Sequence, residues 1–251
     1  MSVGVQFAPA PRGPVFLTAE WRNLVMLNYE VDAALLASYV PQGTELDAFG
    51  RKTLVSLVGF RFLRTRMLGA VRVPFHSNFD EVNLRFYVRR RAPGGEVRRG
   101  VVFIREIVPR LAIALVARLA YHENYHRHSM RHRVRAMDSG VRAEYQWRHR
   151  GNWMGLRAEG VGEPALPANG SMEQFVTEHY WGYARQPDGG TVEYRVAHPQ
   201  WSVWRSANAA FFGDGVAAYG PTFGAALARQ PDSAFVAEGS AVTVFAGKRI
   251  A

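Results

Sequence analysis

Polar and apolar residues alternate along much of this chain, and a period of two residues is typical of a β-strand with one face on a core. The alternating segments are short, rich in β-branched and aromatic residues, and bounded by Gly, Pro or Asp. They cover residues 53–62, 79–89, 96–104, 141–148, 192–196 and 241–245. Strands therefore dominate the predicted fold.

Helical patterns are fewer, and they cover residues 32–39, 111–121 and 171–180. Asp32 is a suitable N-cap for the first helix, and Pro41 marks its end. Ser171 and Gln174 predict a capping box at the start of the third helix. These helices are too few to form a layer of their own, so we expect them at the periphery of a β-rich fold.

The organisation of the chain points to one domain. Its 251 residues are 48% hydrophobic and can bury a substantial core. The Pro- and Gly-bearing stretch 160–170 is the best candidate for a linker, but it is better interpreted as a long loop within a domain. We therefore predict a single α+β domain, dominated by β-structure, over residues 1–251.

Composition also indicates the cellular compartment of the protein. Cysteine is absent, which excludes disulfides and thiolate metal sites and favours a reducing compartment. The first residues lack the basic segment and apolar core of a signal peptide. The longest apolar run, 111–117, is far shorter than the roughly 20 residues needed to cross a bilayer. We expect a cytoplasmic protein with no membrane partner.

The net charge of +10 belongs to the first part of the chain, where residues 1–150 hold 24 Lys and Arg against 12 Asp and Glu. The densest group of arginines flanks the turn sequence at 92–95, which predicts a β-hairpin with arginines at a solvated tip. Nucleic-acid binding would require a recognition helix or aromatic stacking platforms, and no such motif is present. We therefore expect no nucleic-acid partner, and keep as one alternative a non-enzymatic binding protein that uses this Arg-rich first half.

Four of the eight histidines lie between residues 121 and 132, where His122, Glu123 and His126 spell H-E-x-x-H. On a helix the two histidines would share a face and could bind zinc, with Glu123 as general base. His132 follows at the spacing of a third ligand, but Ser129 stands where the longer zinc motif has glycine. A zinc-dependent hydrolase is therefore a second alternative.

The segment 79–88 carries a candidate binding site. Its alternation places four apolar residues on one face and Glu81, Asn83, Arg85 and Tyr87 on the other. This second face either meets solvent or lines a polar cavity inside a curved sheet. An acid, an amide, a guanidinium and a phenol in register would suit a small carboxylate or carbonyl compound.

Arg105 and Glu106 follow an apolar segment, so one of the two should point inward and need a partner. An internal arginine paired with Glu81 is one solution. If Glu81 and Arg85 are themselves buried, we expect them to be hydrogen-bonded to each other or bridged by a ligand.

Seven segments of the chain resemble, in order, those of one bacterial family. They are residues 21–29, 39–41, 79–88, 100–104, 124–130, 175–180 and 198–201. The resemblance, to the YqjF-like family (domain of unknown function 2071), extends over nearly the whole chain. That family is similar to acetoacetate decarboxylase, which implies a curved, mostly antiparallel β-structure closing like a cone around a central cavity.

The same resemblance bears on the chemistry. It implies that Glu81 takes the place of the decarboxylase's cavity glutamate. The decarboxylase forms its Schiff base on a Pro-Lys-Lys turn, which falls approximately at Asn124, Tyr125 and His126 here, and none of these can condense with a ketone. It also implies a helix that ends near Tyr121, which would make the H-E-x-x-H spelling accidental.

The sequence thus predicts a protein with a polar internal cavity that binds or acts on a small acidic or carbonyl-bearing metabolite without Schiff-base chemistry. Glu81 is the candidate catalytic residue. The candidate substrate-binding residues are Asn83, Arg85, Arg105, Tyr125 and His126. We expect no metal and no cofactor, and the sequence leaves open both catalysis and a homo-oligomer.

Overall fold

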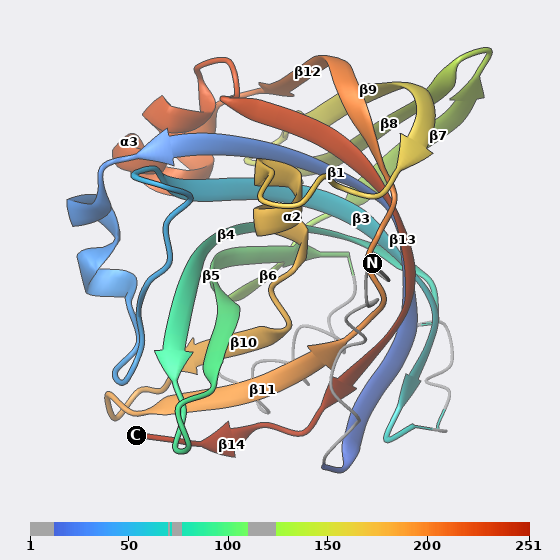
Figure 1. Ribbon diagram of the computed structural model, residues 1–251. Coiled ribbons are helices and arrows are strands. Elements are labelled where there is room, and N and C mark those ends of the chain that lie inside the picture. The colour runs from blue at the N-terminus through green and yellow to red at the C-terminus, as the bar shows by residue number, and fades with distance from the viewer. Residues whose placement is uncertain (1–12, 70, 72–76, 110–123) are drawn as a thin grey trace.

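The computed structural model describes residues 13–69, 71, 77–109 and 124–251. Within these ranges fourteen strands belong to one sheet that bends around a common interior (Figure 1). The strands of the first half are β1 (Val15–Val31), β2 (Glu45–Leu46), β3 (Thr53–Met67), β4 (Phe79–Arg91), β5 (Val97–Val108), β6 (Tyr125–Arg127) and β7 (Met130–Met137). Those of the second half are β8 (Gly140–His149), β9 (Asn152–Ala165), β10 (Trp181–Arg185), β11 (Thr191–Ala197), β12 (Val203–Phe212), β13 (Ser233–Phe245) and β14 (Lys248–Arg249).

The order of strands in the sheet is β14-β11-β10-β5-β4-β3-β1-β13-β12-β9-β8-β7. All pairings are antiparallel except those of β5 with β6 and with β10. β11 also pairs with β13, where Val196 lies opposite Val244, so part of the sheet curls back onto itself. This closure gives the sheet an inner face, which surrounds a cavity, and an outer face. The predicted architecture, a curved and mostly antiparallel β-structure around a central cavity, is confirmed.

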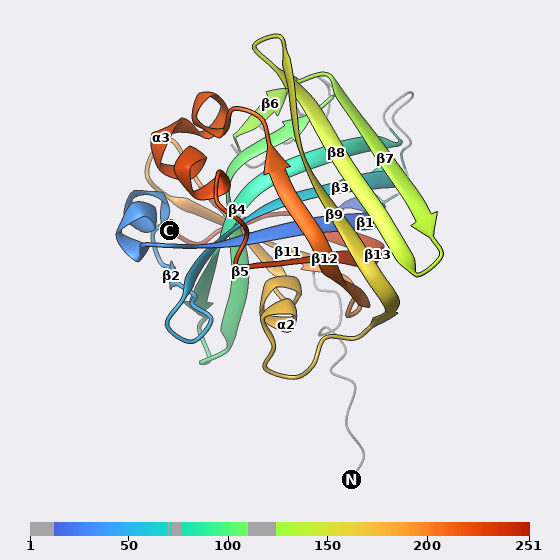
Figure 2. The ribbon, with the colours of Figure 1, turned by 90° about the horizontal axis from the view of Figure 1, so that it is seen from above.

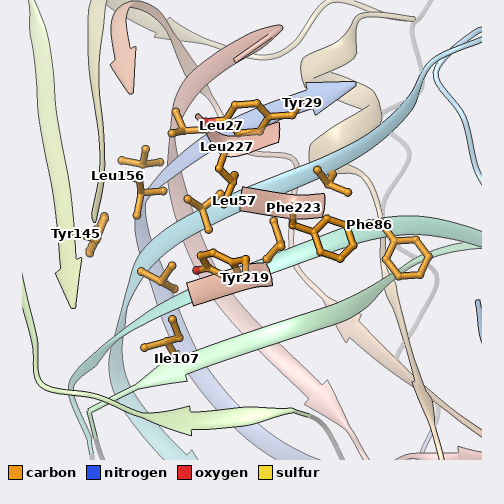
Figure 3. Packing of buried hydrophobic residues seen from close by; sticks show 14 of the residues in the cluster. Leu27, Tyr29, Leu57, Phe86, Ile107, Tyr145, Leu156, Tyr219, Phe223 and Leu227 are labelled. Carbon is orange, nitrogen blue, oxygen red and sulfur yellow. The ribbon is translucent and has the colours of Figure 1, made fainter. Parts of the chain in front are cut away.

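The outer face of the sheet carries the largest apolar core. Val82, Leu84 and Phe86 of β4 point into it, together with residues of α3 (Gly215–Leu227) and of β8 and β9. Figure 3 shows members of this core from several elements, among them Phe86 of β4, Phe223 of α3 and Leu156 of β9. Viewed from above, β7, β8 and β9 form a ribbon that crosses over β1 and β3 (Figure 2).

The crossing ribbon approaches β3 closely at Gly59. A Cβ atom at this position would lie 2.9 Å from side-chain carbons of both Leu156 and Tyr145. Such contacts are shorter than side chains tolerate, so only glycine allows the two layers to meet here. Tyr145 passes over the glycine and donates a hydrogen bond of 2.9 Å to the carbonyl of Asn23.

The predicted helices are partly confirmed. The first forms as a 3-10 helix, η1 (Ala33–Tyr39), whose N-cap Asp32 accepts a hydrogen bond from the backbone of Ala34. The third forms as α2 (Met172–Thr177), in which Ser171 accepts from the Gln174 amide, but it ends earlier than predicted because Glu178 leaves the helical conformation. The helix expected over 111–121 lies outside the described residues. None of the helices in the described ranges is long and apolar enough to cross a membrane.

In the second half one prediction is wrong, and one helix was not predicted. Residues 160–165 are not a loop, because β9 continues to Ala165 and pairs with β12. The sequence pattern also missed α3, which is built mainly from small residues and is kinked where Gly220 has a φ of 77° before Pro221. A helix of small residues has no clear apolar stripe, and periodicity therefore does not reveal it.

The predicted hairpin is confirmed between β4 and β5, with Gly94 and Gly95 at positive φ in its turn. The expectation that its arginines are merely solvated is wrong for three of them. Arg99 forms an ion pair of 2.6 Å with Asp47, whose side chain is 6% exposed. Arg90 and Arg98 form ion pairs with Glu193 of β11, whose side chain is only 5% exposed. These ion pairs place hairpin arginines against a buried carboxylate of β11.

Candidate ligand-binding site

A cavity of about 150 Å³ lies within the curved part of the sheet. On the scale at which one water molecule needs some 10–15 Å³, it has room for roughly ten waters or one small organic molecule. Much of its wall is aromatic, with residues from β1, β3, β4 and β5 and from the second half of the chain. The aromatic residues are Phe16, Trp21, Phe60, Phe62, Phe79, Phe103, Tyr125, Trp181, Tyr194 and Trp201.

The polar face of β4 forms the hydrophilic part of this cavity. Glu81, Asn83 and Arg85 line it and are 3%, 1% and 8% exposed, respectively. The opposite face of the same strand is also buried, in the outer core. The alternation left open whether the polar face of β4 meets solvent or lines a cavity. In the structure it lines the cavity.

Of the two arrangements expected for Glu81 and Arg85, a direct hydrogen bond or a bridging ligand, the direct hydrogen bond is not formed. Glu81 accepts a hydrogen bond of 3.0 Å from the side-chain amide of Asn83. Arg85 instead donates to the carbonyl of Val176 at 3.4 Å, and its guanidinium carbon lies 5.8 Å from the centre of the Tyr87 ring. Within the described residues Arg85 has no carboxylate partner, and its Nε is buried without a hydrogen-bond acceptor.

A bulge in β5 decides which residue of the neighbouring strand faces the cavity. Leu84 lies opposite Arg105, but the next residue, Arg85, lies opposite Phe103, so Ile104 is an additional residue in β5. The bulge shifts the alternation by one position. Glu106 lines the cavity as a result, together with Phe103.

Arg105 points to the other side of the sheet, and its predicted place at the substrate is wrong. Its guanidinium donates to the carbonyl of Ala218 and lies 5.7 Å from the centre of the Tyr219 ring, both in α3. The inward residue of the Arg105–Glu106 pair is the acid. A regular strand would have placed the arginine there.

The short strand β6 separates the two remaining candidates. Tyr125 lines the cavity, as predicted. His126 is the next residue and therefore points to the opposite side, where its Nε2 lies 2.9 Å from the side-chain oxygen of Asn124. Its expected position at the ligand is wrong, because adjacent residues of a strand face in opposite directions.

His179, which follows α2, was not predicted to belong to the site. It lines the cavity, and its Nε2 lies 3.3 Å from Oδ2 of Asp47, which also accepts a hydrogen bond of 2.6 Å from Nε of Arg99. Burial lowers the pKa of His179 to about 4, with Arg99 and Arg85 contributing in the same direction. Burial would raise the pKa of Asp47, but its hydrogen bonds to His179 and Arg99 outweigh this effect and lower it.

His198 is a second buried histidine on the cavity wall. Its ring stacks on Trp201 with the ring centres 4.1 Å apart, and its Nδ1 donates to the carbonyl of Pro199 at 2.8 Å. Burial lowers its pKa to about 4, and the charge of Arg85 acts in the same direction. Both cavity histidines are therefore neutral at pH 7, and Arg85 is the only cation among the described residues that line the cavity.

The two lysines of the chain lie away from the cavity. Lys52 is half exposed and forms an ion pair of 2.9 Å with Glu30. Lys248 is exposed in β14. An imine between a cavity-bound ketone and either amine would require the ligand to leave the cavity.

The described residues include only part of the histidine-rich segment 121–132. His122 and Glu123 lie outside the described residues. His126 lies in strand β6, so one continuous helix does not carry both histidines of the motif. His132 in β7 places its Nδ1 2.9 Å from Oδ2 of Asp80. Among the described residues no group of three or more metal-binding side chains comes together.

The chain matches one protein family over most of its length. The profile of DUF2071, described as an uncharacterized conserved protein, matches residues 18–241. The uncharacterized protein YqjF of Bacillus subtilis (strain 168) is 27% identical over 85 residues, which are 34% of this chain and 35% of YqjF. The alignment thus spans about a third of that relative.

Several solved structures share the fold. Acetoacetate decarboxylase from Legionella pneumophila has a TM-score of 0.65 at 15% identity, with 98% of this chain and 94% of that chain covered. The enduracididine biosynthesis enzyme MppR, complexed with pyruvate, has a TM-score of 0.67 at 13% identity, with 98% and 93% covered. An acetoacetate decarboxylase-like enzyme from Sphingomonas wittichii RW1 has a TM-score of 0.63 at 12% identity over the full length of both chains.

Proposed function

This chain belongs to the DUF2071 family and has the acetoacetate decarboxylase-like fold, and on that basis we propose that its cavity binds a small carboxylic acid through Arg85. The ligand stays non-covalent, because neither lysine reaches the cavity. Glu81 faces the same space and is the carboxylate that can orient the ligand or exchange a proton with it.

One observation carries this proposal. Arg85 is a guanidinium buried in a cavity, yet it has no carboxylate partner in the described part of the chain and keeps an unpaired Nε. A buried cation is costly unless an opposite charge compensates it. The planar guanidinium matches the geometry of a carboxylate, so a small organic acid is the compensating ligand that best fits.

The rest of the wall supports a ligand with an apolar body. Aromatic side chains from several strands surround the polar group, and such rings favour hydrocarbon or aromatic parts of a ligand. The distant relative MppR was solved with pyruvate, a small carboxylic acid. A carboxylate with a compact apolar body is therefore the proposed ligand class.

Calorimetric titration with phenylacetate tests the proposal, with phenylacetamide as a control that has the same body but no charge. We expect phenylacetate to bind and phenylacetamide to bind at least about tenfold more weakly, since hydrogen bonds to charged groups contribute about 1.5–3 kcal/mol. Arg85→Gln should lower the affinity for phenylacetate by a similar factor.

Arg105→Gln is the matched control, because Arg105 lies in the adjacent strand but faces α3. This variant should bind phenylacetate as the wild type does. Equal binding of acid and amide, or unchanged affinity in Arg85→Gln, would refute Arg85 as the anion-binding group.

A further inference from the structure

We infer that the ligand is a 2-hydroxy acid, whose carboxylate meets Arg85 and whose hydroxyl donates a hydrogen bond to Nδ1 of His179. This inference rests on the proposed function and narrows its ligand class. It follows from the tautomer of His179 and from the unpaired polar atoms of the cavity wall.

Asp47 fixes the tautomer of His179. Oδ2 of Asp47 can only accept, so Nε2 of His179 must carry the proton in the contact of 3.3 Å between them. Arg99 holds the same carboxylate oxygen from the other side at 2.6 Å. In the neutral imidazole Nδ1 then has a lone pair and no hydrogen. Asp47 and Arg99 are positioning residues, because they act on the ligand through His179.

The ring of His179 is held in place by its neighbours. Its centre lies 4.6 Å from that of Tyr87 and 5.0 Å from that of Phe175. Only 1% of its side chain is exposed, and Nδ1 has no hydrogen-bond partner in the described structure. A rigid acceptor on a residue that lines the cavity thus lacks a donor.

The unpaired atoms of the cavity wall are of both kinds. Nε of Arg85 and Nε1 of Trp21 are donors, whereas Nδ1 of His179 and Oδ1 of Asn83 are acceptors. A simple acid or a keto acid supplies acceptors only and would leave the acceptors of the wall desolvated. A hydroxy acid supplies acceptors through its carboxylate and a donor through its hydroxyl.

The hydroxyl is expected near the carboxylate. Arg85 donates to Val176 in α2, and His179 lies two residues after the end of the same helix. Arg85 is also close enough to contribute to the electrostatic environment of His179. A hydroxyl on the carbon next to the carboxylate suits two groups held so near to each other.

Three acids with one carbon skeleton provide the test. Mandelate carries the 2-hydroxyl, benzoylformate carries a 2-keto group, and phenylacetate carries neither. We expect the wild type to bind mandelate at least about tenfold more tightly than the other two, because sites built to pair a ligand hydroxyl discriminate strongly against analogues that lack it.

His179→Phe keeps an aromatic ring and removes the acceptor. In this variant we expect the affinity for mandelate to fall to that for phenylacetate, while the affinity for phenylacetate changes little. His149→Phe is the control, because His149 lies outside the cavity wall and contacts the carbonyl of Ala217. It should retain the preference for mandelate.

Nitrogen-15 NMR of the wild type gives a second test that requires no variant to fold. Nδ1 of His179 should be unprotonated in the free protein, and its resonance should shift with mandelate but not with phenylacetate. Equal affinity for the three acids, or a protonated Nδ1, would overturn the inference and leave the proposed function intact. If none of the three acids binds, the proposed function itself fails.

Discussion

The β4–β5 hairpin and the cavity differ in what compensates the charge of their arginines. At the β4–β5 hairpin, Glu193 accepts from Arg90 and Arg98 and also from the hydroxyl of Tyr183 at 3.1 Å. In the cavity, Arg85 meets a backbone carbonyl and an aromatic ring but no carboxylate of the described chain. The hairpin arginines thus have a carboxylate of the protein as partner, whereas Arg85 has none among the described residues.

The difference separates a structural role from a binding role. The hairpin arginines connect β4 and β5 to β11, and Arg98 also lies 4.2 Å from the ring centre of Trp181 in β10. Every partner in that group comes from the protein, so its charges contribute to holding strands together. Arg85 lines the cavity, and in the proposed function its electrostatic partner is the carboxylate of the ligand.

Removal of the hairpin carboxylate should have the largest effect on stability. Glu193→Leu leaves Arg90 without its carboxylate and Arg98 with only Glu96. Because both arginine side chains are mostly buried, we expect a loss of about 4 kcal/mol in the free energy of unfolding, measured by urea denaturation. Glu96→Leu, at a half-exposed position, should cost no more than about 1 kcal/mol. Similar small losses in both variants would show that the hairpin group is not structural.

Acid should lower the free energy of unfolding because His198, in the cavity wall, is buried in its neutral form. The pKa of His198 is lowered to about 4 in the folded protein from an ordinary value of 6.5, so the unfolded chain binds a proton in this range when the folded protein does not. Stability should therefore fall as the pH decreases from about 6.5 to about 4. At 1.36 kcal/mol per pKa unit the contribution of His198 is about 3 kcal/mol.

Urea denaturation of His198→Phe across this pH range measures that contribution. Phenylalanine keeps the stacking on Trp201 and cannot titrate. The variant should lose less stability on acidification than the wild type. If the two proteins have parallel pH profiles, burial of a neutral His198 is not the cause.

Replacement of the cavity arginine should affect stability least. Arg85→Leu removes a buried charge that lacks a carboxylate partner, so we expect the free energy of unfolding to change by less than about 1 kcal/mol or to increase. Arg90→Leu, which leaves Glu193 with one arginine fewer, should cost more. A loss above about 2 kcal/mol in Arg85→Leu would mean that the protein itself compensates this charge.

Borohydride should leave the protein unmodified in the presence of acetoacetate. Lys52 and Lys248 lie outside the cavity, so no imine is held there for reduction. Mass spectrometry of the treated protein detects an adduct directly. A stoichiometric adduct at either lysine would contradict non-covalent binding and would indicate that this protein forms an imine, as Schiff-base enzymes do.

The site residues show how far sequence reasoning reaches. Glu81, Asn83 and Arg85 were predicted from alternation within one strand, and all three line the cavity. Arg105 was misplaced because a bulge without a glycine or proline to mark it inverts the alternation of β5. His126 was misplaced because a predicted turn is a strand, in which only Tyr125 faces inward.

His179 could not be found in this way. Its partner Asp47 is 132 residues earlier in the chain, and the two meet where α2 packs on β4 and β5, with Phe175 against Tyr87 and Arg99. The segment 175–180 was noted for its family resemblance, but nothing in it indicates a tautomer or an unpaired nitrogen. That information depends on which groups surround the ring.

The sequence by itself determined that the protein is β-dominated, where six of its fourteen described strands run in whole or in part, and which side chains of β4 share a face, because alternation and turn chemistry are local properties of a chain. The tertiary structure alone decided that this face encloses a cavity, that Glu106 and not Arg105 enters it, and that Arg85 is left without a carboxylate partner among the described residues. These outcomes depend on strand register and on the closure of the sheet, which contacts between residues distant in the chain establish.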